Sequence, residues 1–179
     1  MRTRIANLAF SVAIASSALP SAQANGIAES RREIERVVEN FRAAIVDKDQ
    51  KSFMGLFLRD EITWVAVIDD ASLNAIVARR TDKRRPRPDK TFSGTPREFI
   101  ETIGKEKGRS EETVDNLRID TDGELAQVWF DYRFLRDGER QNWGKEAWQL
   151  VRTEAGWKIA AVTWSITLDP APPIKPANK

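Results

Sequence analysis

The stretch from Glu124 to Ile166 constrains the fold most, because it predicts three consecutive strands joined by two tight turns. The predicted strands cover Glu124–Arg136, Arg140–Arg152 and Trp157–Ile166, and Asp137-Gly138 is a typical two-residue hairpin turn. Five of the six Trp residues and the only Tyr lie in this stretch. An antiparallel meander so rich in aromatic residues needs a cover on one face to bury them.

Side chains alternate between the two faces of a strand, so residue parity sorts the meander into two surfaces. We expect one surface to face a core or a pocket, and it carries Phe130, Tyr132, Asn142, Glu146 and Trp148. The opposite surface carries Trp129, Arg133, Trp143 and Gln149. Two Trp residues on an outward sheet face are unfavourable unless covered, so this surface predicts a homodimer interface.

Helical patterns precede the meander. Ser30-Arg31-Arg32-Glu33 is a capping box that predicts a helix from about Arg31 to Val46, and Asp49 or Gln50 begins a shorter second helix. Thr95-Pro96-Arg97-Glu98 is another capping box, with Pro at the first helical position. These patterns therefore predict two helices after the first capping box and a third helix at the second capping box.

Strands are predicted between and after these helices. Ile62–Ile68 has the β-branched and aromatic content of a buried strand, Leu73–Ala78 is interpreted as its returning partner, and Thr113–Asp120 precedes the meander. Helices followed by long antiparallel strands predict an α+β fold, with helices on one face of a strongly curved sheet. Such a sheet leaves a cone whose wide end can hold a pocket.

The segment from Arg79 to Lys90 contains seven basic residues, two Pro residues and almost nothing apolar. One interpretation is a basic loop for an anionic ligand or surface; the other is a solvated loop between two elements. Asp82 and Asp89 dilute the charge, and the missing aromatic residues argue against nucleic-acid binding.

The N-terminus predicts export. Arg2 and Arg4 precede the apolar run Ile5–Ala18, and Ala22-Gln23-Ala24 is a small-x-small cleavage pattern, so residues 1–24 are interpreted as a secretory signal peptide. We then expect one domain over residues 25–168 and a Pro-rich extended tail over 169–179, in a periplasmic or secreted protein. No membrane attachment is expected after cleavage.

Composition narrows the chemistry. The two Arg residues of the signal segment account for the net charge of +2, so the remaining chain is balanced and predicts no nucleic-acid partner. The absence of Cys and His removes disulfides, the usual zinc and copper ligands, and nucleophile–His catalysis. No metal and no cofactor are therefore expected.

Three motifs resemble the nuclear-transport-factor-2-like superfamily, and within it the polyketide-cyclase-like (SnoaL-like) and lumazine-binding-like bacterial group. They are Thr95–Ile100, Ala126–Phe134 with Asp137-Gly138, and Ala147–Arg152 with Gly156–Ile159. The resemblance implies a cone-shaped, cystatin-like sheet, antiparallel or mixed, with three helices on its concave face. Members include isomerases, dehydratases, cyclases, pocket binders and adaptors, so the fold alone selects no function.

The chain differs from these relatives at several positions where they carry His or Tyr. Asn142, Ala161 and Thr163 occupy positions where relatives carry His, and the first predicted helix lacks a Tyr. The expected function is therefore a pocket protein that binds a small apolar or aromatic molecule, without clear catalytic machinery. The predicted pocket residues are Trp64, Phe130, Tyr132, Asn142, Glu146 and Trp148.

Two alternatives remain. The first is an isomerase-, dehydratase- or cyclase-type enzyme, in which Glu146 serves as acid or base and Tyr132 as hydrogen-bond donor. The second is a dimeric protein-interaction module that uses the outward Trp face or the basic segment.

Overall fold

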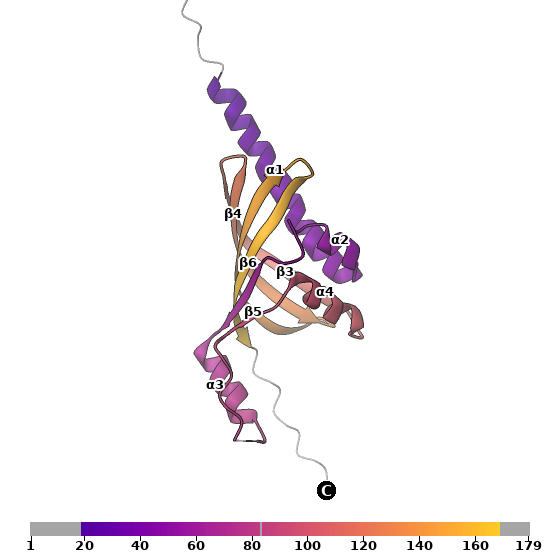
Figure 1. Ribbon diagram of the computed structural model, residues 1–179, viewed down its shortest axis with the longest axis vertical. Coiled ribbons are helices and arrows are strands. Elements are labelled where there is room, and N and C mark those ends of the chain that lie inside the picture. The colour runs from indigo at the N-terminus through magenta and orange to yellow at the C-terminus, as the bar shows by residue number, and fades with distance from the viewer. Residues whose placement is uncertain (1–18, 83, 169–179) are drawn as a thin grey trace, which may run out of the picture.

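The computed structural model describes residues 19–82 and 84–168, which form a six-stranded sheet with helices on one side (Figure 1). The strand order is β2-β1-β6-β5-β4-β3, and the β1–β6 pair is parallel while the other pairs are antiparallel. The strands are β1 (Thr63–Ile68), β2 (Thr91–Ser93), β3 (Ser110–Thr121), β4 (Leu125–Arg136), β5 (Glu139–Thr153) and β6 (Gly156–Leu168). Most of the predicted signal peptide and all of the predicted tail lie outside the described residues.

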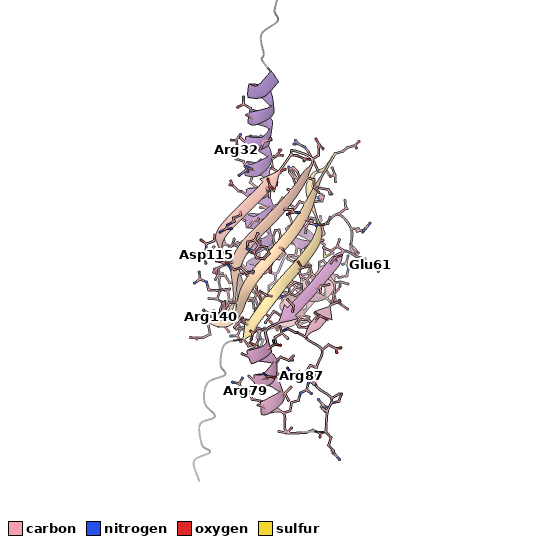
Figure 2. The ribbon with its side chains drawn as sticks, turned by 90° about the vertical axis from the view of Figure 1, so that its left-hand side faces the viewer. Arg32, Glu61, Arg79, Arg87, Asp115 and Arg140 are labelled. Carbon is pink, nitrogen blue, oxygen red and sulfur yellow. The ribbon has the colours of Figure 1, made fainter. Side chains whose placement is uncertain are left out.

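Three helices cover one face of this mixed sheet, as an α+β cone requires. They are α1 (Leu19–Asp47), α2 (Gln50–Met54) and α4 (Pro96–Lys105). A fourth helix, α3 (Asp70–Arg79), extends beyond the lower end of the sheet in Figure 1. Figure 2 looks onto the opposite, uncovered face, with Arg79 and Arg87 below the sheet.

The first predicted helix boundary is wrong. Ser30 is not an N-cap; it lies inside α1, is fully buried and accepts a hydrogen bond from Arg152 Nη1 at 3.2 Å. The preceding residues are compatible with a helix, and Ser30 uses its hydroxyl for a tertiary contact. The predicted apolar face is confirmed, since Ile34, Phe41 and Ile45 are at most 2% exposed.

The predicted strand Leu73–Ala78 is also wrong, because this segment lies in α3. Asp69 caps the helix by accepting from the Ser72 amide at 2.9 Å, and the Ser72 hydroxyl accepts from the Leu168 amide at 2.8 Å. The partner of β1 is instead the short strand β2. Asp69 at the N-cap and the absence of Gly or Pro favour a helix over a strand.

Two predicted N-terminal caps and the predicted hairpin turn are confirmed. Thr95 and Glu98 form both bonds of the capping box, and Asp49 caps α2. The β4–β5 hairpin turns at Asp137 and Gly138 with φ of 50° and 84°, as a type I′ turn requires. The basic segment after α3 is exposed at its Arg residues 84, 85 and 87.

Candidate functional site

Four of the predicted pocket residues belong to the filled interior of the cone. Phe130 and Trp148 are at most 1% exposed, and the Trp148 ring lies 4.9 Å from Phe41 and 5.0 Å from Phe130, measured between centroids. Tyr132 and Glu146 are 3% and 5% exposed. The predicted parity of β4 and β5 is therefore right, but these side chains pack as core.

The Tyr132 hydroxyl is already satisfied by protein acceptors. It lies 2.9 Å from Asn142 Oδ1 and 3.0 Å from the Ser165 carbonyl oxygen, and it can donate to either. Burial, followed by the nearby Glu146 and Glu112 carboxyls, raises the Tyr132 pKa. Tyr132 and Asn142, which were predicted as pocket residues, thus join β4 to β5 and β6.

Glu146 is paired within the core rather than with a cation. Its Oε2 accepts a hydrogen bond from Trp148 Nε1 at 2.6 Å. Burial raises the Glu146 pKa to about 7, while the Trp148 bond opposes the shift. A carboxyl with this pKa can exchange a proton near neutral pH.

Glu112 on β3 is a second buried carboxyl that sequence reasoning missed. It is 3% exposed, and burial and the nearby Glu146 raise its pKa well above the usual range. Arg42 donates through Nε to the Glu112 backbone oxygen at 3.0 Å, whereas Glu112 Oε1 has no partner among the described residues. The prediction began this strand at Thr113, so Glu112 was assigned to a charged connection.

An open hollow of about 470 Å³, named here the α4 hollow, lies between α4 and the sheet. Consecutive ring contacts join Trp164 to Trp64 (5.2 Å), Trp64 to Phe99 (5.6 Å) and Phe99 to Phe134 (6.2 Å). Phe92 of β2 also lines the hollow and is 48% exposed. The arrangement offers flat apolar surfaces to a small molecule.

The α4 hollow carries only three ionisable lining residues, Glu98, Glu106 and Arg136. Arg136 forms an ion pair with Glu106 through Nη2. Glu98 Oε2 accepts from the Thr95 amide at 2.9 Å and from its hydroxyl at 3.1 Å. Of the predicted pocket residues, Trp64 alone lines the α4 hollow.

Two of the lining residues that the sequence analysis did not predict had local sequence cues. Phe99 follows the capping box of α4, and Phe134 shares the parity of Tyr132 on β4. Trp164 and Phe92 come together with them only through the parallel β1–β6 pair and the β1–β2 pair, which local patterns do not reveal.

The uncovered face of the sheet carries the predicted outward residues. Trp129 and Trp143 are 46% and 42% exposed, and Gln149 is exposed on the same face. Arg133 pairs with Asp115, which Figure 2 labels on the edge strand β3, and the Arg140 guanidinium lies 5.8 Å from the Trp143 ring centroid. Parity is confirmed here, while the interface role stays a prediction.

Two further features concern the described residues only. Residues 19–82 and 84–168 contain no group of three or more His, Cys, Asp or Glu placed to hold a metal ion. No helix within these ranges is long and apolar enough to cross a membrane.

Comparison with known proteins identifies the fold. No family model and no curated protein matches the sequence. The chain is similar to a solved nuclear-transport-factor-2-like protein with a cystatin-like fold from Novosphingobium aromaticivorans, at 13% identity and a TM-score of 0.60, covering 88% of this chain and 94% of that one.

Two proteins of unknown function show the same likeness. The Pseudomonas putida KT2440 protein is 16% identical with a TM-score of 0.53, covering 86% of this chain and 98% of that one. The Shewanella baltica OS155 protein is 13% identical with a TM-score of 0.54, covering 79% and 97%. Both are described as nuclear-transport-factor-2-like. The chain therefore has the nuclear-transport-factor-2-like, cystatin-like fold.

Proposed function

We propose that this protein binds a small apolar or aromatic molecule in the α4 hollow. The observation that carries the proposal is the continuous series of contacting aromatic rings along an open volume of about 470 Å³. The inner end of the cone is filled by Phe41, Phe130 and Trp148, whereas the α4 hollow is open.

The energetics favour a ligand with a flat apolar body. Each aromatic ring that a ligand covers removes apolar area from water at about 25 cal/mol per Å². Offset or edge contacts between rings add about 0.5–1.5 kcal/mol per pair. The half-exposed Phe92 gains most from being covered, because the fold itself leaves it in solvent.

A size series at Gly94 tests the site. Gly94 lines the α4 hollow, and a Cβ added there would meet Glu98 Oε2 at 3.4 Å and Trp64 Cδ1 at 3.7 Å, which are ordinary contacts. Gly94→Ala should leave room for a ligand, whereas the larger side chain of Gly94→Leu should obstruct the hollow. The fluorescent probe 1-aminoanthracene should bind the wild type and Gly94→Ala with similar affinity.

We expect Gly94→Leu to weaken 1-aminoanthracene binding by at least about tenfold, since a tenfold loss corresponds to 1.4 kcal/mol. Circular dichroism spectra and thermal unfolding of both variants would establish that the fold is kept. Equal binding by Gly94→Leu and the wild type would place the probe elsewhere and reject the site.

Acid–base catalysis by Glu146 is a second candidate, favoured by its pKa of about 7. Glu112 beside it would supply the like charge that keeps one proton on the pair. Neither residue lines the α4 hollow, so a substrate would have to displace core side chains to reach them. A Glu146→Gln variant that keeps full turnover on an identified substrate would reject this role.

We also propose that the protein works outside the cytoplasm, on the strength of the N-terminal pattern alone. Cleavage after Ala24 would remove Leu19–Ala24 from α1 and leave the buried face from Ser30 onward intact. Mass spectrometry of protein from the periplasmic fraction of its host should give a chain that begins at Asn25. A full-length chain recovered only from the cytoplasm would contradict export.

A further inference from the structure

We propose that the ligand of the α4 hollow is an organic cation, with a protonated amine or quaternary ammonium group attached to its apolar body. This inference rests on the proposed function, because it assigns the ligand's charge within the same site. It depends on the kind of rings that line the hollow and on the balance of charge around them.

The aromatic rings that line the hollow can attract a cation. An aromatic ring has a negative face and a positive edge, so a cation within about 6 Å of the ring centre is attracted to the face. Two Trp residues, which attract cations best, and three Phe residues line the α4 hollow. Trp64 and Trp164 lie 5.2 Å apart at 59°, so their faces are inclined to each other.

The charges of the lining also favour a cation. Two carboxylates, Glu98 and Glu106, face one guanidinium, Arg136, which leaves one net negative charge. Arg136 and Glu106 neutralise each other in an ion pair, so Glu98 supplies the unbalanced charge. A cationic ligand would offset the charge of this exposed carboxylate while its apolar body covers the aromatic rings.

Glu98 is held in place without a cation. The Thr95 amide and hydroxyl both bind Oε2, and the Glu98 amide donates to Thr95 Oγ1 at 3.1 Å. Both bonds end on Oε2, which is the carboxylate oxygen next to Gly94 in the lining. The capping box thus holds the Glu98 carboxylate near Trp64. A Cβ added at Gly94 would contact both Glu98 Oε2 and the Trp64 ring.

An anionic ligand fits less well. Arg136 donates to Glu106 through Nη2, and its Nε atom is shielded from solvent without a partner. Nε is therefore not offered to a molecule in the open hollow, and Nη2 is already paired with Glu106. Glu98 also occupies the N-terminus of α4, where the helix dipole would otherwise attract an anion.

A matched pair of probes separates charge from shape. Benzyltrimethylammonium and its neutral isostere neopentylbenzene have nearly the same size, and Trp fluorescence can follow the binding of each. We expect the wild type to bind the cation at least about tenfold more tightly, which corresponds to 1.4 kcal/mol. Glu98→Gln should weaken binding of the cation about fivefold and leave that of the isostere unchanged.

Glu98→Gln is a suitable variant because Gln also completes a capping box, so α4 should keep its start. Glu154→Gln, in the exposed turn between β5 and β6, is the control and should change neither affinity. Equal affinities for the two probes, unaffected by Glu98→Gln, would overturn the cation assignment and leave the hollow as a binding site. Failure of both probes to bind, together with failure of 1-aminoanthracene, would overturn the cation assignment and the proposed function together.

Discussion

Glu146 and Glu112 are two carboxyls whose ionisation the fold opposes. Burial raises the Glu146 pKa from 4.5 to about 7, so between these pH values the folded chain retains a proton that the unfolded chain releases. The free energy of unfolding should therefore fall as the pH rises through this window, by about 3 kcal/mol from Glu146 alone, and then level off. The raised Glu112 pKa acts in the same direction.

Glu146→Gln should flatten this pH dependence. Gln cannot ionise, and its side-chain oxygen can still accept from Trp148 Nε1. Urea unfolding at pH 5 and pH 8 would measure the free energy of unfolding for the wild type and the variant. An identical difference between the two pH values in both proteins would contradict the assignment of Glu146.

Tyr132→Phe should destabilise the fold by about 1 kcal/mol, the usual net contribution of a hydrogen bond. The change removes the hydroxyl that bonds to Asn142 Oδ1 and the Ser165 carbonyl oxygen, and it keeps the ring in the core. Chemical denaturation gives the difference. Because the residues interact, the double variant Tyr132→Phe/Asn142→Ala should cost less than the sum of the single changes; strict additivity would argue against the bond.

At the scale of elements, Gly144 controls how closely β5 approaches β6. A Cβ at this position would meet the Ser165 carbonyl oxygen at 2.1 Å, which no side-chain movement can relieve because the oxygen is backbone. Gly144→Ala should therefore disrupt the β5–β6 pair and cost more than about 3 kcal/mol. Thermal unfolding, or the loss of soluble protein, would show this.

Gly26→Ala is the matched control for that change. Gly26 lies in α1 with nothing within 4 Å of an added Cβ, and it is the second residue of a chain cleaved after Ala24, so the substitution should change stability little. Similar melting temperatures for Gly144→Ala and Gly26→Ala would show that β5 and β6 can separate without cost.

Local patterns predicted the elements that depend on local interactions. The Thr95–Glu98 capping box, the Asp137-Gly138 turn and the parity of β4 and β5 are all confirmed. Ser30 was misinterpreted because its hydroxyl makes a tertiary contact with Arg152, and Leu73–Ala78 because the N-cap at Asp69 was overlooked.

The site was harder to predict than the fold. Trp64 and Trp164 meet through a parallel pairing of strands that are distant in the sequence, and Phe99 reaches them from α4. Parity correctly placed Glu146 and Trp148 on the covered face, but it cannot tell which part of that face is filled. That distinction depends on side-chain packing across three helices.

At the scale of the whole molecule, the uncovered sheet face is the predicted dimer interface. Trp129 and Trp143 are each more than 40% exposed, and aromatic and Arg side chains are typical of interface cores. We expect the wild type to sediment as a homodimer and the double variant Trp129→Ala/Trp143→Ala to sediment as a monomer. Leu125→Ala, another exposed apolar residue in β4, is the control for general loss of apolar surface.

This sedimentation experiment tests whether the uncovered sheet face is a dimer interface. A monomeric wild type, or a double variant that stays dimeric, would remove the interface role of Trp129, Arg133, Trp143 and Gln149. The α4 hollow lies on the opposite side of the sheet, so ligand binding should be the same in the dimer and in the monomeric variant.

Native mass spectrometry of the protein purified from its own host tests the central claim most directly. The account predicts a second species, heavier than the free chain by the mass of one small molecule, in the wild type and in Gly94→Ala. This species should be missing in Gly94→Leu, whose side chain should obstruct the α4 hollow. A bound molecule that persists in Gly94→Leu, or free chain alone in all three proteins, would contradict the account.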